Sequence, residues 1–356
     1  MVVTGRWRAQ RNWGCRISEG SLSGLRTVTL ENRSLRLTFL LDKGADLVEI
    51  LYKPQDLDLA WLTANGVRDP RAYANSSPDV SSTFHDYYPG GWQEPFPNMG
   101  VSASVWGAIF GQHGEAPNLP WDVEILEDAA EGVAVRFSVR TPKAPFRLER
   151  TVSLRGAAAR FRYDGRVANE SDVPLHVMWG HHITFGTPFL HPGVRIVMPD
   201  GVRTFVHPGD HEDSWLPAGA EGPWPLLPAT PGAPARPDGM ADLSVLPPHG
   251  SPHEMNYITG FGDEGWYRVE SDQHGVGAKV TWDAATYPFV WHWHEYGANP
   301  GYFAYGRHYN IGLEPATSWS TNGLPGAIAN GTALPLPPRA ERTSWVEYEV
   351  FPIDPV

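Results

Sequence analysis

The sequence predicts an all-β protein, built as a large antiparallel β-sandwich, on three observations. Glycine and proline together supply 71 of the 356 residues (37 Gly and 34 Pro), which favours many short strands joined by turns over long helices. Apolar residues alternate with polar ones along several segments, as they do in half-buried strands. A content of 42 aromatic residues (15 Trp, 13 Tyr and 14 Phe) argues against disorder. The chain therefore has the composition of stacked antiparallel sheets.

The alternating segments are the expected strands. They recur along most of the chain, at 35–41, 133–139, 146–154, 161–165, 266–270 and 276–282. The last two flank Asp272-Gln-His-Gly275, which predicts a hairpin turn. The sequence contains no repeat of fixed period, which argues against a propeller or a solenoid.

One stretch, at about 208–252, is rich in Pro, Gly and Ala and lacks alternation. It is either an interdomain linker or an insertion that packs over one face of the sandwich. Because strand patterns resume after it, we expect an insertion within a single domain spanning 1–356.

Composition also limits the classes of partner. The formal net charge of −12 and the lack of a basic stripe argue against nucleic-acid binding. We find no run of 18 apolar residues and no apolar signal-peptide core after Met1, so we expect no membrane span and a cytoplasmic protein. The single cysteine, Cys15, excludes an internal disulfide. The oligomeric state is not determined by the sequence.

Two strand-end segments carry ionisable groups that suit acid–base chemistry. His181 and His182 end a strand expected from Leu175, and only one of them can point into a given cleft, because adjacent strand residues face opposite sides. In the second segment Pro315 stops the strand and holds Glu314 in an extended conformation. The alternative for both segments is a solvated position at a sheet rim.

Two Gly/Pro loops carry further candidates. Glycines flank His113 and let another group approach it, and Trp121 follows as a surface on which a sugar ring could stack. The loop at 90–97 carries Trp92, Gln93 and Glu94, and binding or purely structural roles are equally compatible with it.

A third histidine pattern, at 290–295, is compatible with a metal site. His292 and His294 share one face of a strand, and Trp291 and Trp293 share the other. Two histidines at this spacing can chelate a metal, but a site needs three or four converging ligands. We therefore predict no metal at these histidines, and place His294 among candidate substrate contacts.

In order and spacing these segments resemble the aldose 1-epimerase (galactose mutarotase) family, over roughly residues 25–325. The resemblance rests on the Gly44-Ala45 turn, the Gly90-Gly91 loop with Phe96-Pro97, the His113-Gly114 loop ending at Trp121, the His182-x-x-Phe185 strand and the Glu314-Pro315 pair. It implies a galactose mutarotase-like sandwich of the supersandwich type.

The resemblance also implies a proton-transfer function without a metal or a cofactor. His182 would be the general acid, Glu314 the general base and His113 a substrate hydrogen-bonding group. From their places in the loops and strand ends described above we expect further substrate contacts at Trp92, Gln93, Glu94, Trp121, His181 and His294. The family's sugar-binding arginine has no counterpart, and the Gly-Gly loop lacks basic residues for a phosphate. We therefore expect an epimerase of a free, non-phosphorylated aldose.

Three other functions stay open at this stage. The first is a non-catalytic carbohydrate-binding or regulatory protein on the same fold, because fold does not determine function. The second is a metal enzyme that uses His292 and His294. The third is a polysaccharide lyase, which would need a basic groove that the sequence does not show.

Overall fold

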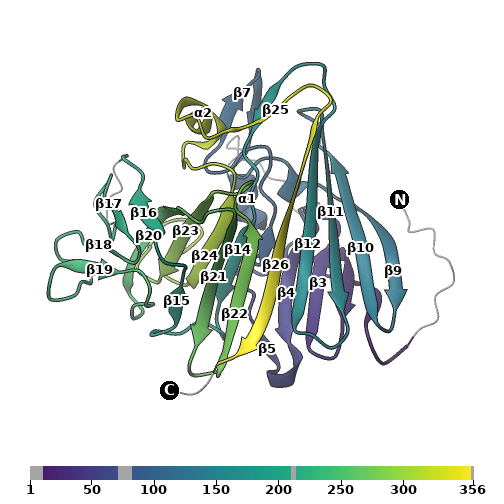
Figure 1. The fold of residues 1–356 in the computed structure, drawn as a ribbon, viewed down its shortest axis with the longest axis horizontal. Coiled ribbons are helices and arrows are strands. Elements are labelled where there is room, and N and C mark those ends of the chain that lie inside the picture. The colour runs from purple at the N-terminus through teal and green to yellow at the C-terminus, as the bar shows by residue number, and fades with distance from the viewer. Residues whose placement is uncertain (1–10, 71–81, 210–213, 354–356) are drawn as a thin grey trace.

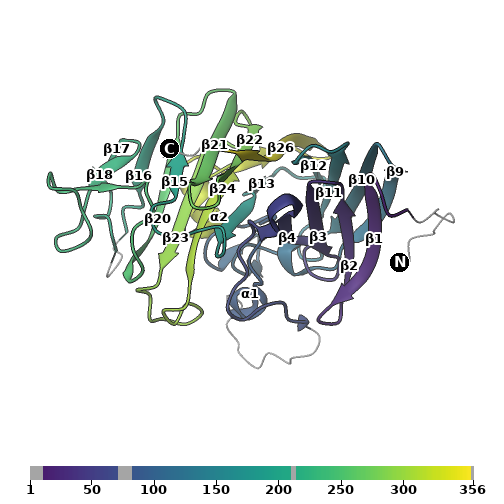
Figure 2. The same cartoon turned by 90° about the horizontal axis from the view of Figure 1, so that it is seen from below.

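The computed structural model describes residues 11–70, 82–209 and 214–353, which form two large antiparallel sheets stacked on one another. Figure 1 shows the long strand β26 (Glu341–Pro352) at the centre of the front sheet, between β12 and β22. Figure 2 shows the two layers from below, with the helix α1 (Ser82–Tyr87) beneath the lower one. The prediction of an all-β sandwich is confirmed.

The lower layer is a twelve-stranded sheet. In spatial order its strands are β1 (Arg16–Leu22), β2 (Leu25–Glu31), β3 (Leu35–Leu40), β4 (Asp46–Tyr52), β6 (Trp92–Gln93), β14 (His182–Gly186), β24 (Tyr309–Ala316), β23 (Phe289–Tyr296), β20 (Ser251–Thr259), β16 (Arg203–Val206) and β17 (Glu221–Pro223), and β5 (Leu57–Asp58) pairs with β4. Strands from the beginning and the end of the chain therefore meet at its centre, where β6, β14 and β24 lie side by side.

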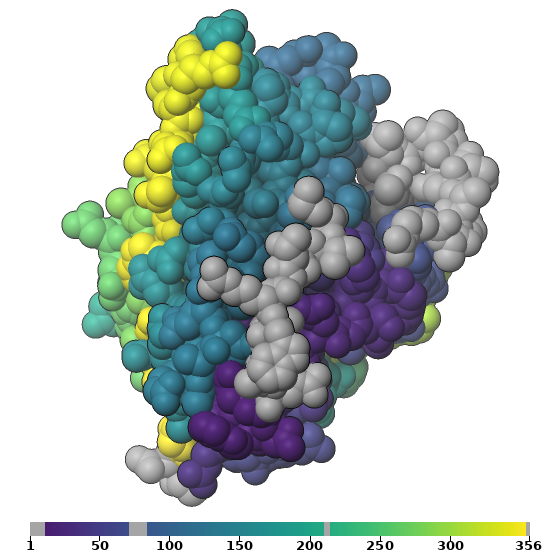
Figure 3. Space-filling view, turned by 90° about the vertical axis from the view of Figure 1, so that its right-hand side faces the viewer, coloured from purple at the N-terminus to yellow at the C-terminus, as the bar shows by residue number. Residues whose placement is uncertain are grey.

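The upper layer is an eight-stranded sheet. Its order is β15 (Arg195–Val197), β21 (Glu264–Ser271), β22 (Val276–Asp283), β26, β12 (Arg160–Asn169), β11 (Phe146–Arg155), β10 (Gly132–Arg140) and β9 (Asp122–Ala129). The predicted hairpin at 272–275 is confirmed, since it joins β21 to β22. At the far edge of the molecule β1 contacts β9 and β10, and Figure 3 shows this purple N-terminal segment beside the blue strands.

Short elements complete the described part of the chain. Three two-stranded pairs are β7 (Ala103–Val105) with β8 (Ala108–Phe110), β13 (Leu175–Val177) with β25 (Leu334–Leu336), and β18 (Leu226–Pro228) with β19 (Met240–Asp242). A second helix, α2, covers Gly323–Ala329, and 3₁₀ turns occur at Lys53–Gln55 and Ala116–Asn118.

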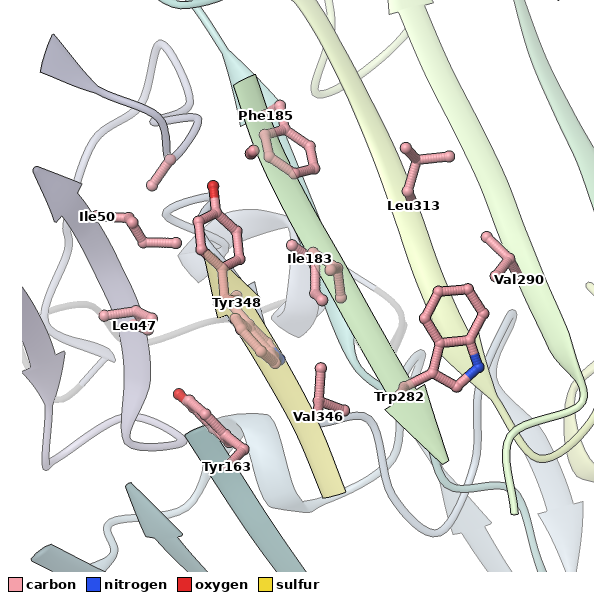
Figure 4. Close-up of a cluster of buried hydrophobic side chains, with 14 of the residues drawn as sticks. Leu47, Ile50, Tyr163, Ile183, Phe185, Trp282, Val290, Leu313, Val346 and Tyr348 are labelled. Carbon is pink, nitrogen blue, oxygen red and sulfur yellow. The ribbon is translucent and has the colours of Figure 1, made fainter. Parts of the chain in front are cut away.

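The core lies between the two sheets and follows from the alternation of residues in the strands. In β11 every second side chain from Phe146 to Leu154 is buried. Figure 4 shows the core with Trp282, Val346 and Tyr348 from the eight-stranded sheet facing Ile183, Val290 and Leu313 from the twelve-stranded one. Each such side chain contributes about 1.5–3 kcal/mol when it leaves water.

The described parts of the Pro/Gly-rich stretch, 208–209 and 214–252, include residues that pack onto this core. Trp215, Leu227, Leu243 and Leu246 belong to the same hydrophobic cluster as the sheet residues. Its strand β17 extends the edge of the twelve-stranded sheet beyond β16. The assignment of 1–356 to one domain stays a prediction.

One strand prediction was wrong. His182 does not end the strand that begins at Leu175, because β13 stops at Val177 and pairs with β25 in a separate ribbon. His182 instead begins the next strand, β14, in the middle of the large sheet.

Candidate active site

A cleft of about 240 Å³ opens on the outer face of the twelve-stranded sheet, away from the eight-stranded one. Its size suits a ligand smaller than the drug-sized molecules that fill 300–1,000 Å³ sites. The lining residues come from β14, β20, β23 and β24, from α1 and from loops: Phe84, His85, Tyr88, Gly100, Val101, Gln112, His113, His182, Met255, Trp291, Trp293, Glu295, Asn299, Tyr302, Phe303, Glu314 and Thr321.

His182 and Glu314 meet in this cleft because their strands are neighbours. Thr184 pairs with Gly312 and Gly180 bridges to Ala316, so the register places His182 opposite Glu314. Directly opposed residues share a face of the sheet. The His182 Nε2 to Glu314 Oε1 distance is 3.5 Å, longer than a hydrogen bond. The pair lies at the distance where a reacting group can contact both.

A tyrosine contacts the other side of the His182 ring. The Tyr88 hydroxyl lies 3.2 Å from His182 Nδ1. Tyr88 is buried, and its ring lies edge-on to the imidazole with a centroid separation of 5.2 Å. This contact orients the ring so that Nε2 faces Glu314.

His113 reaches the same cleft from a tight turn. Its own φ is 58°, and the following Gly114 has φ 80°. A Cβ on Gly114 would lie 2.2 Å from the Phe96 carbonyl oxygen, so only glycine fits at this position. The turn places the His113 ring 5.0 Å from the His182 ring and 4.4 Å from Phe84, measured between centroids.

Burial shifts the protonation of all three groups toward their neutral forms. It lowers the pKa of His182 to about 3, and it lowers the pKa of His113 well below its usual value, with the neighbouring His182 and His85 adding to the effect. Burial raises the pKa of Glu314 well above 4.5. Among the described residues neither Glu314 oxygen has a hydrogen-bond partner, so the carboxyl group is open to a ligand.

Four predicted substrate contacts lie elsewhere, and the expectation for them is corrected. Trp92, Gln93, Glu94 and Trp121 are buried, and none of them lines the cleft. Trp92 stacks on Tyr163, Gln93 donates to Asp46, Glu94 pairs with Arg150, and Trp121 packs under the Arg150 guanidinium. Their contacts are therefore with other side chains of the fold and not with the cleft.

His181 and His294 also lie outside the cleft. His181 points to the inner side of the sheet, where Trp92 Nε1 donates to its Nδ1 and the Tyr287 hydroxyl lies 3.2 Å from its Nε2. His294 stacks on His292 at 4.6 Å on the core side of β23, beside Trp215. The alternation of strand residues separates both from the cleft, as it separates His181 from His182.

Several lining residues were missed by the sequence interpretation. Glu295 shares its strand face with Trp291 and Trp293, so the same alternation that separated the histidines could have indicated it. Tyr88 and Phe303 lie in segments without a strand pattern, and only the folded chain brings them to the cleft.

A second depression, of about 650 Å³, lies on the eight-stranded sheet and is lined by residues such as Arg136, Glu149, Asp164 and Arg166. Its charges form a ladder of ion pairs across neighbouring strands, including Arg136–Glu124 and Arg166–Glu149. Among the described residues that line this depression, no acid and base lie together free of other partners. The smaller cleft is therefore the candidate active site.

Neither a metal centre nor a membrane helix is found in the described part of the chain. Within residues 11–70, 82–209 and 214–353 no three His, Cys, Asp or Glu side chains converge as metal ligands. His292 and His294 thus have no third ligand there. No described helix has the length and apolarity to cross a bilayer.

Comparison with known proteins adds the fold and the family. Solved structures with a similar fold include a Klebsiella pneumoniae protein named as a proposed aldose 1-epimerase (TM-score 0.73, 17% identity, 95% of this chain and 84% of that one). A galactose mutarotase related enzyme from Lactobacillus acidophilus has a TM-score of 0.60 and 15% identity, over 92% of this chain and 98% of that one. A galactose mutarotase-like protein from Clostridium acetobutylicum has a TM-score of 0.58 and 13% identity, over 96% of this chain and 99% of that one.

No curated protein is significantly similar in sequence. The fold is therefore galactose mutarotase-like. The sequence profile of one family matches residues 22–214, and the chain belongs to that family, the domain of unknown function DUF4432.

Proposed function

We propose that this protein is an aldose 1-epimerase that interconverts the anomers of a free aldose. The observation that carries the proposal is the buried His182–Glu314 pair, 3.5 Å apart in a cleft the size of a small ligand. Anomer exchange needs one proton removed from the anomeric hydroxyl and one delivered to the ring oxygen. Both oxygens are bonded to the same carbon, so the base and the acid must be near neighbours.

In the proposed reaction Glu314 accepts the proton of the anomeric hydroxyl while His182 protonates the ring oxygen. The bond from C1 to the ring oxygen breaks and the open-chain aldehyde forms. Rotation about C1–C2 presents the other face of the aldehyde, and the reverse proton transfers close the ring. His113 hydrogen-bonds a substrate hydroxyl, and Tyr88 keeps the His182 ring in place.

The protonation state of the buried pair is compatible with this cycle. A neutral Glu314 with a neutral His182 holds as many protons as an ionised Glu314 with a protonated His182. Only the position of one proton differs between these two states. A bound hemiacetal that donates to Glu314 and accepts from His182 stabilises the ionised arrangement that starts the reaction.

Polarimetry tests the proposal. A freshly dissolved pure anomer of a neutral aldose, such as α-D-glucose or α-D-galactose, is followed toward equilibrium with and without enzyme. We expect Glu314→Gln and His182→Asn each to lower the enzymatic rate by about 10²–10⁴-fold, the usual contribution of a general acid or base.

Matched control variants separate chemistry from stability. Glu221 on β17 and His176 on β13 are exposed and outside the cleft, so Glu221→Gln and His176→Asn should keep the full rate. If Glu314→Gln also keeps the full rate, the assignment of the base is wrong. If no aldose in the panel equilibrates faster than in buffer, the epimerase proposal fails for those sugars.

The second candidate is a sugar-binding protein without turnover. The shift of Glu314 and His182 toward their neutral forms favours it, because the empty cleft does not hold a ready-made base. Saturable sugar binding, measured by calorimetry, together with an unchanged rate of anomer exchange would support this candidate over the enzyme.

A further inference from the structure

A second carboxylate lies in the cleft, on the same face of β23 as the tryptophans. Glu295 lines the cleft and has only 5% of its surface exposed. The Asn299 side-chain amide donates to Glu295 Oε1 at 2.9 Å. Its other oxygen, Oε2, makes no hydrogen bond of ordinary geometry with a described residue, although the Trp293 side chain also lowers the pKa of this carboxyl group. A buried oxygen without a partner is costly, and a ligand group that donates to it would remove that cost.

The register places Glu295 at a distance from the acid–base pair. Trp291 pairs with Glu314, and Glu295 follows four residues later on the same strand. At about 3.4 Å per residue the Cα atoms of Trp291 and Glu295 are about 14 Å apart along the strand. Glu295 therefore faces the part of a bound sugar that is remote from the anomeric carbon.

The surroundings of Glu295 are polar and poorly satisfied. Asn310, its direct cross-strand neighbour, is buried with neither side-chain amide atom hydrogen-bonded to another described residue. Asn299 approaches from the loop after β23, which also supplies Tyr302 and Phe303 to the cleft wall. This end of the cleft is thus equipped for a hydrogen-bonding substituent instead of an apolar one.

The charge of the lining favours a cation. Two carboxyl groups, on Glu295 and Glu314, line the cleft, whereas none of its lining residues in the described part of the chain is a lysine or an arginine. Arg307 is exposed and directed to Asn65, and Arg68 acts electrostatically on the lining residue Tyr302 without lining the cleft itself. Burial raises the pKa of Glu295 to about 7, and an adjacent ammonium would restore the ionised form. The aromatic rings of Trp293 and Phe303 can also flank a cation.

We infer that Glu295, held by Asn299, is the specificity-determining residue of this cleft, and that it selects an aldose carrying a free protonated amine, an amino sugar, over neutral, N-acetylated and acidic analogues. For the reaction, this inference rests on the proposed function, because it names the substrate class of the same site.

Titration calorimetry tests the selection with a matched set of ligands. The set is a hexosamine, its N-acetyl derivative, the parent hexose and the corresponding hexuronic acid, each titrated at pH 6.5. We expect the hexosamine to bind the wild-type protein at least tenfold more tightly than the parent hexose. Glu295→Gln should abolish this preference.

The number of protons released on binding gives a second test. If Glu295 were only structural, binding would release no protons from it. Binding of an ammonium ionises Glu295 and releases protons, so the binding enthalpy should depend on the ionisation enthalpy of the buffer. The dependence should vanish in Glu295→Gln. Asn299→Ala, which leaves the carboxyl group in place, should retain the proton release and weaken hexosamine binding several-fold.

The outcomes separate this inference from the proposed function. If wild type does not prefer the hexosamine, or if Glu295→Gln keeps the preference, the selection is refuted whether or not anomers exchange. If the preference depends on Glu295 but no sugar is epimerised, the subsite stands and the epimerase proposal fails. Glu221→Gln serves as the control and should match wild type in every titration.

Discussion

Two buried polar regions of the molecule differ in whether their charged groups have partners. In the first region Arg150 pairs with Glu94 at 3.2 Å, and Lys43 pairs with Asp46 at 2.7 Å; all four side chains are essentially inaccessible to solvent. In the cleft on the outer face of the twelve-stranded sheet Glu314 and Glu295 are also buried but face no described cation.

The difference indicates which region is structural and which is functional. A buried charge with a partner of opposite sign has its desolvation cost offset within the fold. Burial raises the pKa of the paired Asp46 and Glu94 as well, so the difference is that the cleft carboxyl groups have no such partner and remain available to a ligand. The ion-pair cluster of Lys43, Asp46, Glu94 and Arg150 thus stabilises the fold, and the outer cleft is where binding energy can be gained.

The largest expected effect on the free energy of unfolding comes from breaking the ion-pair cluster. Arg150→Met removes the cation of Glu94 and leaves a carboxylate buried without its charge partner, which should lower the free energy of unfolding by about 3–5 kcal/mol. Chemical denaturation measures the loss. The double variant Arg150→Met/Glu94→Gln should recover much of it, because Trp179 can still donate to the amide oxygen. A single variant as stable as wild type would contradict the structural role.

A smaller effect is expected from acid titration of a core histidine. Burial lowers the pKa of His292 to about 3, so the unfolded chain binds a proton there below pH 6.5 whereas the folded one does not. The stability that His292 contributes is complete above pH 6.5 and is lost as the pH falls toward 3. Between pH 7 and pH 5 wild type should lose about 2 kcal/mol more than His292→Leu. Parallel stability curves for the two proteins would refute the assignment.

On the cleft side, the next prediction concerns the contact by which Tyr88 orients His182. Tyr88→Phe removes the hydroxyl 3.2 Å from His182 Nδ1 and should slow anomer exchange by about tenfold, which corresponds to about 1.4 kcal/mol. The dependence of the rate on pH should shift as well, because the hydroxyl no longer contacts the imidazole. An unchanged rate and pH profile would show that Tyr88 only fills space.

The smallest expected effect is that of replacing the cleft carboxyl group of Glu314 on the free energy of unfolding. Glu314→Gln replaces a carboxyl group that burial keeps protonated with a neutral amide of the same shape. The free energy of unfolding should change by less than about 1 kcal/mol, in contrast to Arg150→Met. Denaturation curves of the two variants, recorded side by side, check the contrast. A loss as large as that of Arg150→Met would mean that Glu314 is also structural.

The alternation of residues was enough to find several long strands, such as β10, β11 and β12, but not the longest one, β26, and it separated His181 from His182. The prediction for the Gly-Gly loop was wrong because a turn can direct Trp92 and Glu94 to either side of a sheet, and Gly/Pro loops have no period that tells which. The sequence interpretation also missed Arg150 as the partner of Glu94, since the two lie 56 residues apart and meet only between the layers.

By itself the sequence determined the all-β class, the strands and the faces on which alternating residues lie, because these depend on neighbours along the chain. Only the tertiary structure decided that His113, His182 and Glu314 share one cleft, that Glu295 joins them, and that Glu94 faces a buried arginine. These contacts depend on the order and register of strands from distant parts of the chain, which the hydrophobic effect selects for the whole core at once and which no local pattern encodes.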